Sequence, residues 1–208
     1  MWLRKLFDSV VRSALYFGSF NPPHIGHEGI LRYLKECGDF DDICVVLSPQ
    51  NPLKDKRLLL DEGERCKMVK AWIGTLPFVR CSTIEFEMEK PSYTYLTMRR
   101  FRLEQPETLF ALVMGADSLS NLHHWRCYEE LLQHHAIYVY PREGYPFVAS
   151  AFPALQHANA RICWMQAPLF PCSSSAIRQM LEQNGTAEGL LPPVVWDYIR
   201  THHLYGVM

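Results

Sequence analysis

Apolar runs of strand length alternate with segments of helical periodicity along this chain, and this alternation limits the folds open to it. The predicted strands cover 14–17, 43–47, 78–81, 109–114, 136–140 and 161–166. The predicted helices cover 28–37, 65–73, 93–104, 129–134, 174–183 and 194–202. Strands that are apolar throughout are typical of a sheet covered on both faces. The sequence therefore predicts an α/β fold: a Rossmann-like, doubly wound, largely parallel sheet with helices on both faces.

The loop that follows the first predicted strand reads GSFNPPHIGH, from Gly18 to His27. A glycine after a strand lets the backbone approach an anion closely, and a helix start offers unpaired N–H groups and a positive dipole end. His24 and His27 lie three positions apart at that helix start, so their side chains can donate on the same side. This strand–loop–helix arrangement predicts phosphate binding. A helix cap with a packing residue is the purely structural alternative.

The whole chain is expected to form one domain, 1–208, because 208 residues is an ordinary domain length. Apolar positions in 1–12 have helical spacing, and they predict an N-terminal extension with a short helix. Asp61 and Glu64 have capping-box spacing at the start of the second helix. In such a sheet, ligands bind beyond the carboxyl ends of the strands, so the loops after Phe17, Leu47, Met114 and Tyr140 should line one crevice.

Charge, cysteine usage and hydropathy exclude several classes of partner. The net charge of -1 gives no general attraction to nucleic acid or to an anionic membrane, and neither is expected as a partner. No run approaches the roughly 18 apolar residues that span a membrane. The seven cysteines are odd in number and form no CxxC pair, which disfavours a disulfide framework and a zinc site and favours a reducing, cytoplasmic location. The oligomeric state is not readable, and a homo-oligomer is compatible with the sequence.

Paired histidines at 123–124 and 134–135 are weak metal candidates. Adjacent residues do not point to one ligand, and no glutamate or cysteine completes a site at this spacing. No protein-bound metal is expected.

Five sequence elements, in order, resemble one family. Gly18 to His27 resembles the pattern G-[ST]-F-[DN]-P-x-H-x-G-H, and 172–178, CSSSAIR, resembles I-S-S-T-x-I-R. Between them lie PSYT at 91–94, and GADS at 115–118 followed by Trp125; the closing helix near 195–205 also fits. The chain resembles the nicotinate or nicotinamide mononucleotide adenylyltransferases, most closely the bacterial nicotinate-nucleotide adenylyltransferases of the HIGH-type nucleotidyltransferase superfamily. The resemblance covers nearly everything from Tyr16 to Tyr205, and it makes 172–208 a C-terminal helical part that carries a second phosphate motif.

The sequence departs from the family pattern at a few positions. Cys172 stands where the family usually has Ile, and Ser175 where it has Thr. Leu53 replaces the histidine of a P-P-H-K segment, whereas Lys54 is retained. The usual R-P-G reads Arg-Glu-Gly, starting at Arg142.

The resemblance implies adenylyl transfer from ATP to nicotinate mononucleotide, or to nicotinamide mononucleotide, giving deamido-NAD or NAD and pyrophosphate. The nicotinate form is the expected acceptor. The nucleophile is a phosphate monoester that is mostly dianionic at neutral pH, so no general base is required. The reaction needs alignment, relief of anion repulsion and stabilisation of charge at the α-phosphate. Mg2+ is expected to arrive with ATP, held mostly by phosphates and water.

The resemblance also assigns expected roles to residues of this chain. The catalytic residues would be His24, His27 and Arg178. The ATP-binding residues would be Gly18, Ser19, Phe20, His27, Gly115, Asp117, Ser174, Ser175 and Arg178. The mononucleotide-binding residues would be Asn51, Lys54, Thr94, Trp125 and Arg142. The structural alternatives are helix capping for the serines, Asp117 and Thr94, core packing for Trp125, and solvated surface for Lys54 and Arg142.

Three other functions stay open. Pantetheine-phosphate adenylyltransferases share the superfamily, and class I aminoacyl-tRNA synthetases share the HIGH tetrapeptide at 24–27. The chain has no lysine loop of the KMSKS type and no obvious tRNA-binding part, which disfavours a synthetase. A nucleotide-binding regulatory module without catalysis is the third alternative, and pyrophosphate release separates it from an enzyme.

Overall fold

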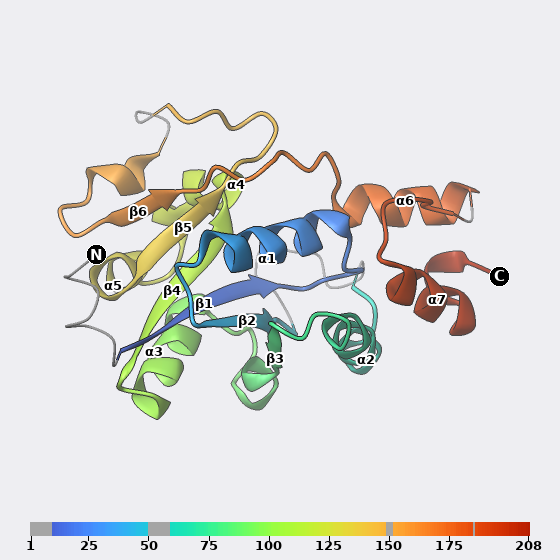
Figure 1. Ribbon diagram of the computed structural model, residues 1–208, viewed down its shortest axis with the longest axis horizontal. Helices are drawn as coiled ribbons and strands as arrows, with labels where there is room; N and C mark the ends of the chain where they lie inside the picture. Colours follow the sequence, from blue (N-terminus) through green and yellow to red (C-terminus); the bar gives the residue numbers. More distant parts are fainter. Residues whose placement is uncertain (1–9, 50–58, 149–151, 185) are drawn as a thin grey trace.

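Six strands form one parallel sheet with the order β3-β2-β1-β4-β5-β6 (Figure 1). The computed structural model describes residues 10–49, 59–148, 152–184 and 186–208. The strands are β1 (Val11–Gly18), β2 (Asp42–Leu47), β3 (Arg80–Ser82), β4 (Thr108–Gly115), β5 (Ala136–Tyr140) and β6 (Arg161–Trp164). Every neighbouring pair is parallel. The strand order reverses between β1 and β4, which is where a doubly wound sheet opens a crevice at its carboxyl edge. The predicted fold class is confirmed.

Helices cover both faces of the sheet. They are α1 (Ile25–Cys37), α2 (Glu62–Ile73), α3 (Thr94–Glu104), α4 (Ala116–Ser120), α5 (Tyr128–His134), α6 (Ser174–Asn184) and α7 (Pro193–Thr201). The described residues also form short 3-10 helices, η3 (Ile84–Glu87), η4 (Leu122–His124), η6 (Pro153–Gln156) and η7 (Leu204–Gly206).

Successive residues of β1 point into two separate cores because side chains alternate along a strand. Ala14 and Tyr16 pack with apolar residues of α1, α2, α6 and α7. Leu15 packs on the opposite face, with apolar residues of α3, α4 and α5. The middle stretches of β1, β2 and β4 are apolar on both sides because helices cover both faces of the sheet there.

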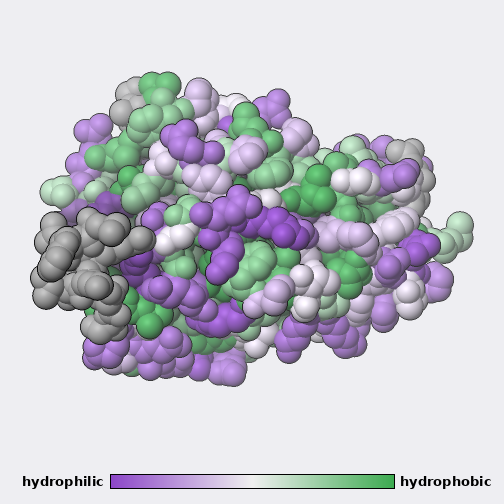
Figure 2. Space-filling model, viewed as in Figure 1, coloured by the Kyte–Doolittle hydropathy of each residue, from purple (hydrophilic) through white to green (hydrophobic). Residues whose placement is uncertain are grey.

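The outer side of α1 forms part of a hydrophilic stripe across the face seen in Figure 2. Its outward positions carry exposed charged side chains such as Arg32, Lys35 and Glu36, whereas Ile30, Leu31 and Leu34 are buried. None of the helices in the described part of the chain is long and apolar enough to cross a membrane.

The predicted boundaries are wrong at the N-terminus and at the edge strands. Val11 and Arg12 belong to β1, where they pair with Thr108 and Leu109 of β4, and not to a helix over 1–12; residues 1–9 lie outside the described residues. The strand expected at 78–81 corresponds to β3, which begins two residues later, at Arg80. It begins later because the backbone N–H of Val79 donates to the Leu76 carbonyl in a turn. The strand expected at 161–166 ends at Trp164.

The predicted capping box of α2 is only half formed. The Asp61 carboxylate accepts hydrogen bonds from the backbone N–H groups of Gly63 and Glu64. The Glu64 side chain does not reach back to the cap in the way a capping box requires. It accepts from Lys67 and from the Tyr198 hydroxyl instead.

Candidate active site

A cleft of about 640 Å³ opens at the carboxyl ends of β1 and β4. Its lining includes Ser19 after β1, Ser48 after β2, Asp117 after β4 and Arg142 after β5. The prediction that the loops after these four strands line one crevice is therefore confirmed. A volume of this size is in the range of small-molecule and cofactor sites.

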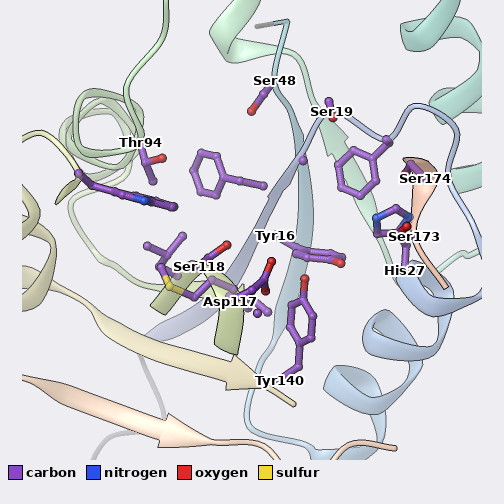
Figure 3. A pocket seen from close by; sticks show the side chains of 18 of the residues that line it. Tyr16, Ser19, His27, Ser48, Thr94, Asp117, Ser118, Tyr140, Ser173 and Ser174 are labelled. Atoms are coloured by element: carbon purple, nitrogen blue, oxygen red, sulfur yellow. The ribbon is translucent and has the colours of Figure 1, made fainter. Parts of the chain in front are cut away.

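Most residues proposed from the sequence lie together in this cleft. Those that line it are Gly18, Ser19, Phe20, His24, His27, Thr94, Gly115, Asp117, Trp125, Arg142, Ser174, Ser175 and Arg178. Asn51 and Lys54 lie outside the described residues. Figure 3 shows Thr94 at one end of the cleft and His27 with Ser174 at the other, with Asp117 between them. After the roles that the family resemblance implies for these residues, we call the two ends the acceptor end and the phosphate end.

The two histidines lie at the start of α1 at the phosphate end. His24 is the N-cap residue of the helix and is 3% exposed. Its backbone N–H donates to His27 Nδ1 over 3.2 Å, and the two rings stack with centroids 3.6 Å apart. Because Nδ1 of His27 accepts this bond, the neutral His27 ring carries its hydrogen on Nε2.

Burial keeps His24 neutral. Desolvation, with a smaller contribution from the charge of Arg142, lowers the pKa of His24 to about 4. The neutral ring donates from one nitrogen only. Nδ1 of His24 lies 3.4 Å from Cys172 Sγ. The contact links the first motif directly to the second.

The second motif is tied to the first by side-chain contacts to the backbone. Ser174 Oγ donates to the Pro22 carbonyl over 2.9 Å, and Arg178 Nη1 donates to the Asn21 carbonyl over 2.8 Å. Ser173 Oγ accepts from the backbone N–H of Ala176, so the capping alternative holds for this serine. The start of α6 is thus held beside the start of α1.

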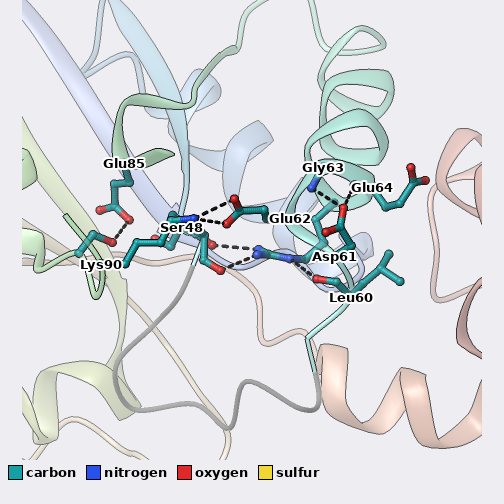
Figure 4. Close-up of polar contacts among 11 residues, drawn as sticks. Ser48, Leu60, Asp61, Glu62, Gly63, Glu64, Glu85 and Lys90 are labelled. Atoms are coloured by element: carbon teal, nitrogen blue, oxygen red, sulfur yellow. Dashed lines mark hydrogen bonds and ion pairs between the residues drawn. The ribbon is translucent and has the colours of Figure 1, made fainter. Parts of the chain in front are cut away.

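Arg65 on α2 organises the cleft and was missed by the sequence reasoning. Its side chain is buried, and its Nη1 donates to the carbonyls of Ser19 and Ser48 over 3.0 and 2.9 Å. Nη2 donates to Pro49 over 2.6 Å, and Nε donates to Leu60 over 3.0 Å (Figure 4). One guanidinium therefore fixes the loops after β1 and β2 relative to the start of α2.

A sequence signal for Arg65 exists. Positions 65, 68, 69 and 72 form a helical stripe that is otherwise apolar, and all four are buried. A charged residue on the buried face of a helix requires polar partners in the interior.

The middle and the acceptor end of the cleft contain polar atoms that lack hydrogen-bond partners within the described part of the chain. Both Asp117 Oδ1 and Trp125 Nε1 are buried. Among the described residues, Asp117 Oδ1 accepts no hydrogen bond and Trp125 Nε1 donates none. Arg142 Nε lies 3.5 Å from Asp117 Oδ1, which is an ion-pair distance and too long for a good hydrogen bond. Buried polar atoms are normally satisfied, so these two are suited to a ligand.

Glu85 also lines the cleft, and the sequence reasoning missed it. Its carboxylate is 2% exposed and accepts from the hydroxyls of Ser92 and Thr97 over 2.7 and 2.8 Å. These bonds fix the segment that leads into α3, and Thr94 is the first residue of that helix.

No group of three or more metal-ligating side chains lies together among the described residues. The adjacent rings of His123 and His124 contact each other with centroids 3.8 Å apart. The expectation that Mg2+ arrives with ATP stays a prediction.

The fold and the two histidine- and serine-bearing helix starts define a nucleotidyltransferase, and residues 15–180 match the cytidylyltransferase-like family model. The chain is 38% identical over 195 residues to a protein of Flavobacterium psychrophilum named a probable nicotinate-nucleotide adenylyltransferase, covering 94% of this chain and 99% of that one. A relative of the same name from Bacteroides thetaiotaomicron is 32% identical over 200 residues, 96% of each chain. This chain therefore belongs to the family of nicotinate-nucleotide adenylyltransferases.

A solved structure supports the fold. The nicotinic acid mononucleotide adenylyltransferase of Plasmodium falciparum, complexed with NaAD, superposes with a TM-score of 0.78. The match has 20% sequence identity and covers 95% of this chain and 98% of that one.

Proposed function

We propose that this protein transfers the adenylyl group of ATP to nicotinate mononucleotide, giving deamido-NAD and pyrophosphate in NAD biosynthesis. The observation that carries the proposal is the composition of one cleft. Two helix starts with donor side chains lie at its phosphate end, Trp125 with an unpartnered ring N–H lies at its acceptor end, and the unpartnered Oδ1 of Asp117 lies between them.

The reaction joins two anions and needs little acid–base chemistry. An oxygen of the mononucleotide phosphate attacks the α-phosphorus of ATP, the bond from that phosphorus to the α–β bridging oxygen breaks, and pyrophosphate leaves. His24 and His27 donate to the α-phosphate oxygens from neutral rings. Burial lowers the pKa of His24, which supports a role as a neutral hydrogen-bond donor.

The remaining ATP-binding residues lie around the phosphate end and the middle of the cleft. Ser174, Ser175 and Arg178 bind the β- and γ-phosphates at the start of α6, and Gly18, Ser19 and Phe20 offer backbone groups to the nucleotide. The absence of a Cβ at Gly115 lets Oδ1 of Asp117 lie close to the backbone at the end of β4. ATP enters as its magnesium complex, with the metal held by phosphate oxygens and water.

The acceptor is held by residues from separate loops. Trp125 stacks on the pyridine ring, and Thr94 contacts the pyridine through its backbone. Asp117 belongs to the ATP-binding residues, and its Oδ1, which has no hydrogen-bond partner in the described residues, accepts from ribose hydroxyls. Arg142 meets the mononucleotide phosphate. Asn51 and Lys54, outside the described residues, are proposed to help bind that phosphate.

Pyrophosphate release from ATP tests the proposal. Nicotinate mononucleotide, nicotinamide mononucleotide and phosphopantetheine are offered separately as acceptors. We expect the highest kcat/KM with nicotinate mononucleotide, with deamido-NAD formed in equal amount to pyrophosphate. Release only with phosphopantetheine would replace the proposed acceptor, and release with none of the three would favour a non-catalytic nucleotide-binding module.

We also propose the cytoplasm as the compartment. All seven cysteines are free thiols, and three of them are exposed. Exposed free thiols persist in a reducing environment.

A further inference from the structure

Two side chains with hydrogen-bond donors line the acceptor end of the cleft. Trp125 Nε1 is buried without a partner in the described part of the chain. Arg126, the next residue, has its guanidinium carbon 5.0 Å from the centroid of the Tyr93 ring. Arg126 makes a cation–π contact with this ring and a hydrogen bond to the Tyr93 side chain, and the other N–H groups of its guanidinium remain available to a ligand.

The described carboxylates in this region are engaged elsewhere. Glu85 accepts from two hydroxyls, and Asp117 faces Arg142. Glu130 at the start of α5 lies 3.9 Å from Arg102. No ion pair involving Arg126 occurs among the described residues, so its positive charge is not neutralised by the protein there.

The two candidate mononucleotide substrates differ in one substituent of the pyridine ring. Nicotinate carries a carboxylate with two acceptor oxygens and a negative charge. Nicotinamide carries a neutral amide, whose N–H groups would face the N–H groups of the protein. A guanidinium donates two parallel hydrogen bonds to a carboxylate, whereas an amide offers it only one acceptor oxygen.

We propose that Arg126 is a specificity-determining residue that selects the mononucleotide with a pyridine carboxylate over the one with an amide. The inference rests on the proposed function, because it assumes that the pyridine ring occupies the acceptor end. Tyr93 holds the guanidinium in place through its ring and side-chain contacts. Exposure of Arg126 to solvent weakens the charge pairing, so a moderate effect is expected.

The test measures kcat/KM for both pyridine mononucleotides at saturating magnesium ATP in the wild type, Arg126→Gln and Arg126→Lys. Arg99→Gln is the matched control, since Arg99 is an exposed arginine of α3 that does not line the cleft. We expect Arg126→Gln to lower kcat/KM for nicotinate mononucleotide about tenfold, the scale of one charged hydrogen bond, and to leave nicotinamide mononucleotide nearly unchanged. Arg126→Lys should retain part of the preference for nicotinate mononucleotide over nicotinamide mononucleotide. The control variant Arg99→Gln should show the same preference as the wild type.

The outcomes separate the two claims. An unchanged ratio of the two kcat/KM values in Arg126→Gln, with an active wild type, overturns the role of Arg126 and leaves the proposed function intact. Equal losses with both acceptors also overturn it. A wild type that releases no pyrophosphate with either acceptor overturns the proposed function and this inference with it. Thermal melting of each variant confirms that folding is unchanged.

Discussion

At the scale of single residues, the hydrogen-bond partners of the two histidines decide what they can do. His27 accepts from the backbone of His24, so its remaining N–H is on Nε2. His24 is buried and has a pKa of about 4, so it is a neutral donor near pH 7. Two neutral donors stabilise charge that develops on a phosphate without the cost of burying a cation in the free protein.

Replacement of either histidine should reduce turnover and spare the fold. We expect His24→Asn and His27→Ala each to lower kcat by at least about a hundredfold, the scale for loss of one transition-state donor. Asparagine is chosen at His24 because it is a good N-cap residue, whereas alanine would leave a buried cavity. Steady-state kinetics and thermal melting are measured together. Near-normal kcat in a folded variant would remove that histidine from the mechanism.

At the scale of elements, α2 acts on the cleft through Arg65 and not through a residue that touches the ligand. The four carbonyls bound by its guanidinium belong to loops that lie up to 46 positions away in sequence. A lysine has all its donors on a single nitrogen, so it cannot reach the four carbonyls that the planar guanidinium of Arg65 binds. Each carbonyl left buried without a donor costs about 1–3 kcal/mol.

Arg65→Lys should therefore destabilise the protein by about 2 kcal/mol, and Arg65→Met by more, in urea unfolding at pH 7. Lys67→Met on the same helix is the control, because Lys67 is an exposed residue whose ion pair with Glu64 contributes little. We also expect the folded Arg65→Lys variant to lose at least tenfold in kcat/KM, because the loops after β1 and β2 both shift. Wild-type stability and activity in Arg65→Met would show that the four bonds are unimportant.

At the scale of the whole molecule, the sheet was predictable because burial on both faces leaves an unbroken apolar run. β5 matches its predicted range residue for residue. The bounds of β3 and β6 differ from the predicted ranges. An edge strand pairs on one side only, and its half-exposed residues do not form the continuous apolar run that marks a buried strand. The two motifs at the starts of α1 and α6 could be found from the sequence because each is local, and their phosphate-binding role stays a prediction. For Arg65 the sequence offers only the sign of a buried charge on α2, because the carbonyls that it binds lie in distant loops. Arg126 was not predictable, because it is an exposed side chain whose place in the cleft depends on the fold.

The pH dependence of stability also belongs to the whole molecule, because it sums over buried histidines in different layers. His24 and His135 both have pKa values of about 4 in the folded protein. For His135 the main cause is burial, with smaller effects from the charges of Arg102, His134 and Arg161. Its Nδ1 is 2.9 Å from the Phe110 carbonyl, which a neutral ring bonds by donating from that nitrogen.

The free energy of unfolding should therefore fall as the pH is lowered from about 6.5 towards 4. In that window the unfolded chain, whose histidines have pKa values near 6.5, binds more protons than the folded protein. Each histidine should remove about 2 kcal/mol by pH 5 and about 3 kcal/mol by pH 4. Urea unfolding at pH 7 and pH 5 measures the slope. His135→Asn keeps a donor for Phe110 and should flatten the slope by about 2 kcal/mol, even if it lowers stability at pH 7. His203→Asn, at an exposed position, is the control, and an equal slope in His135→Asn and the wild type would contradict the assignment of acid sensitivity to His135.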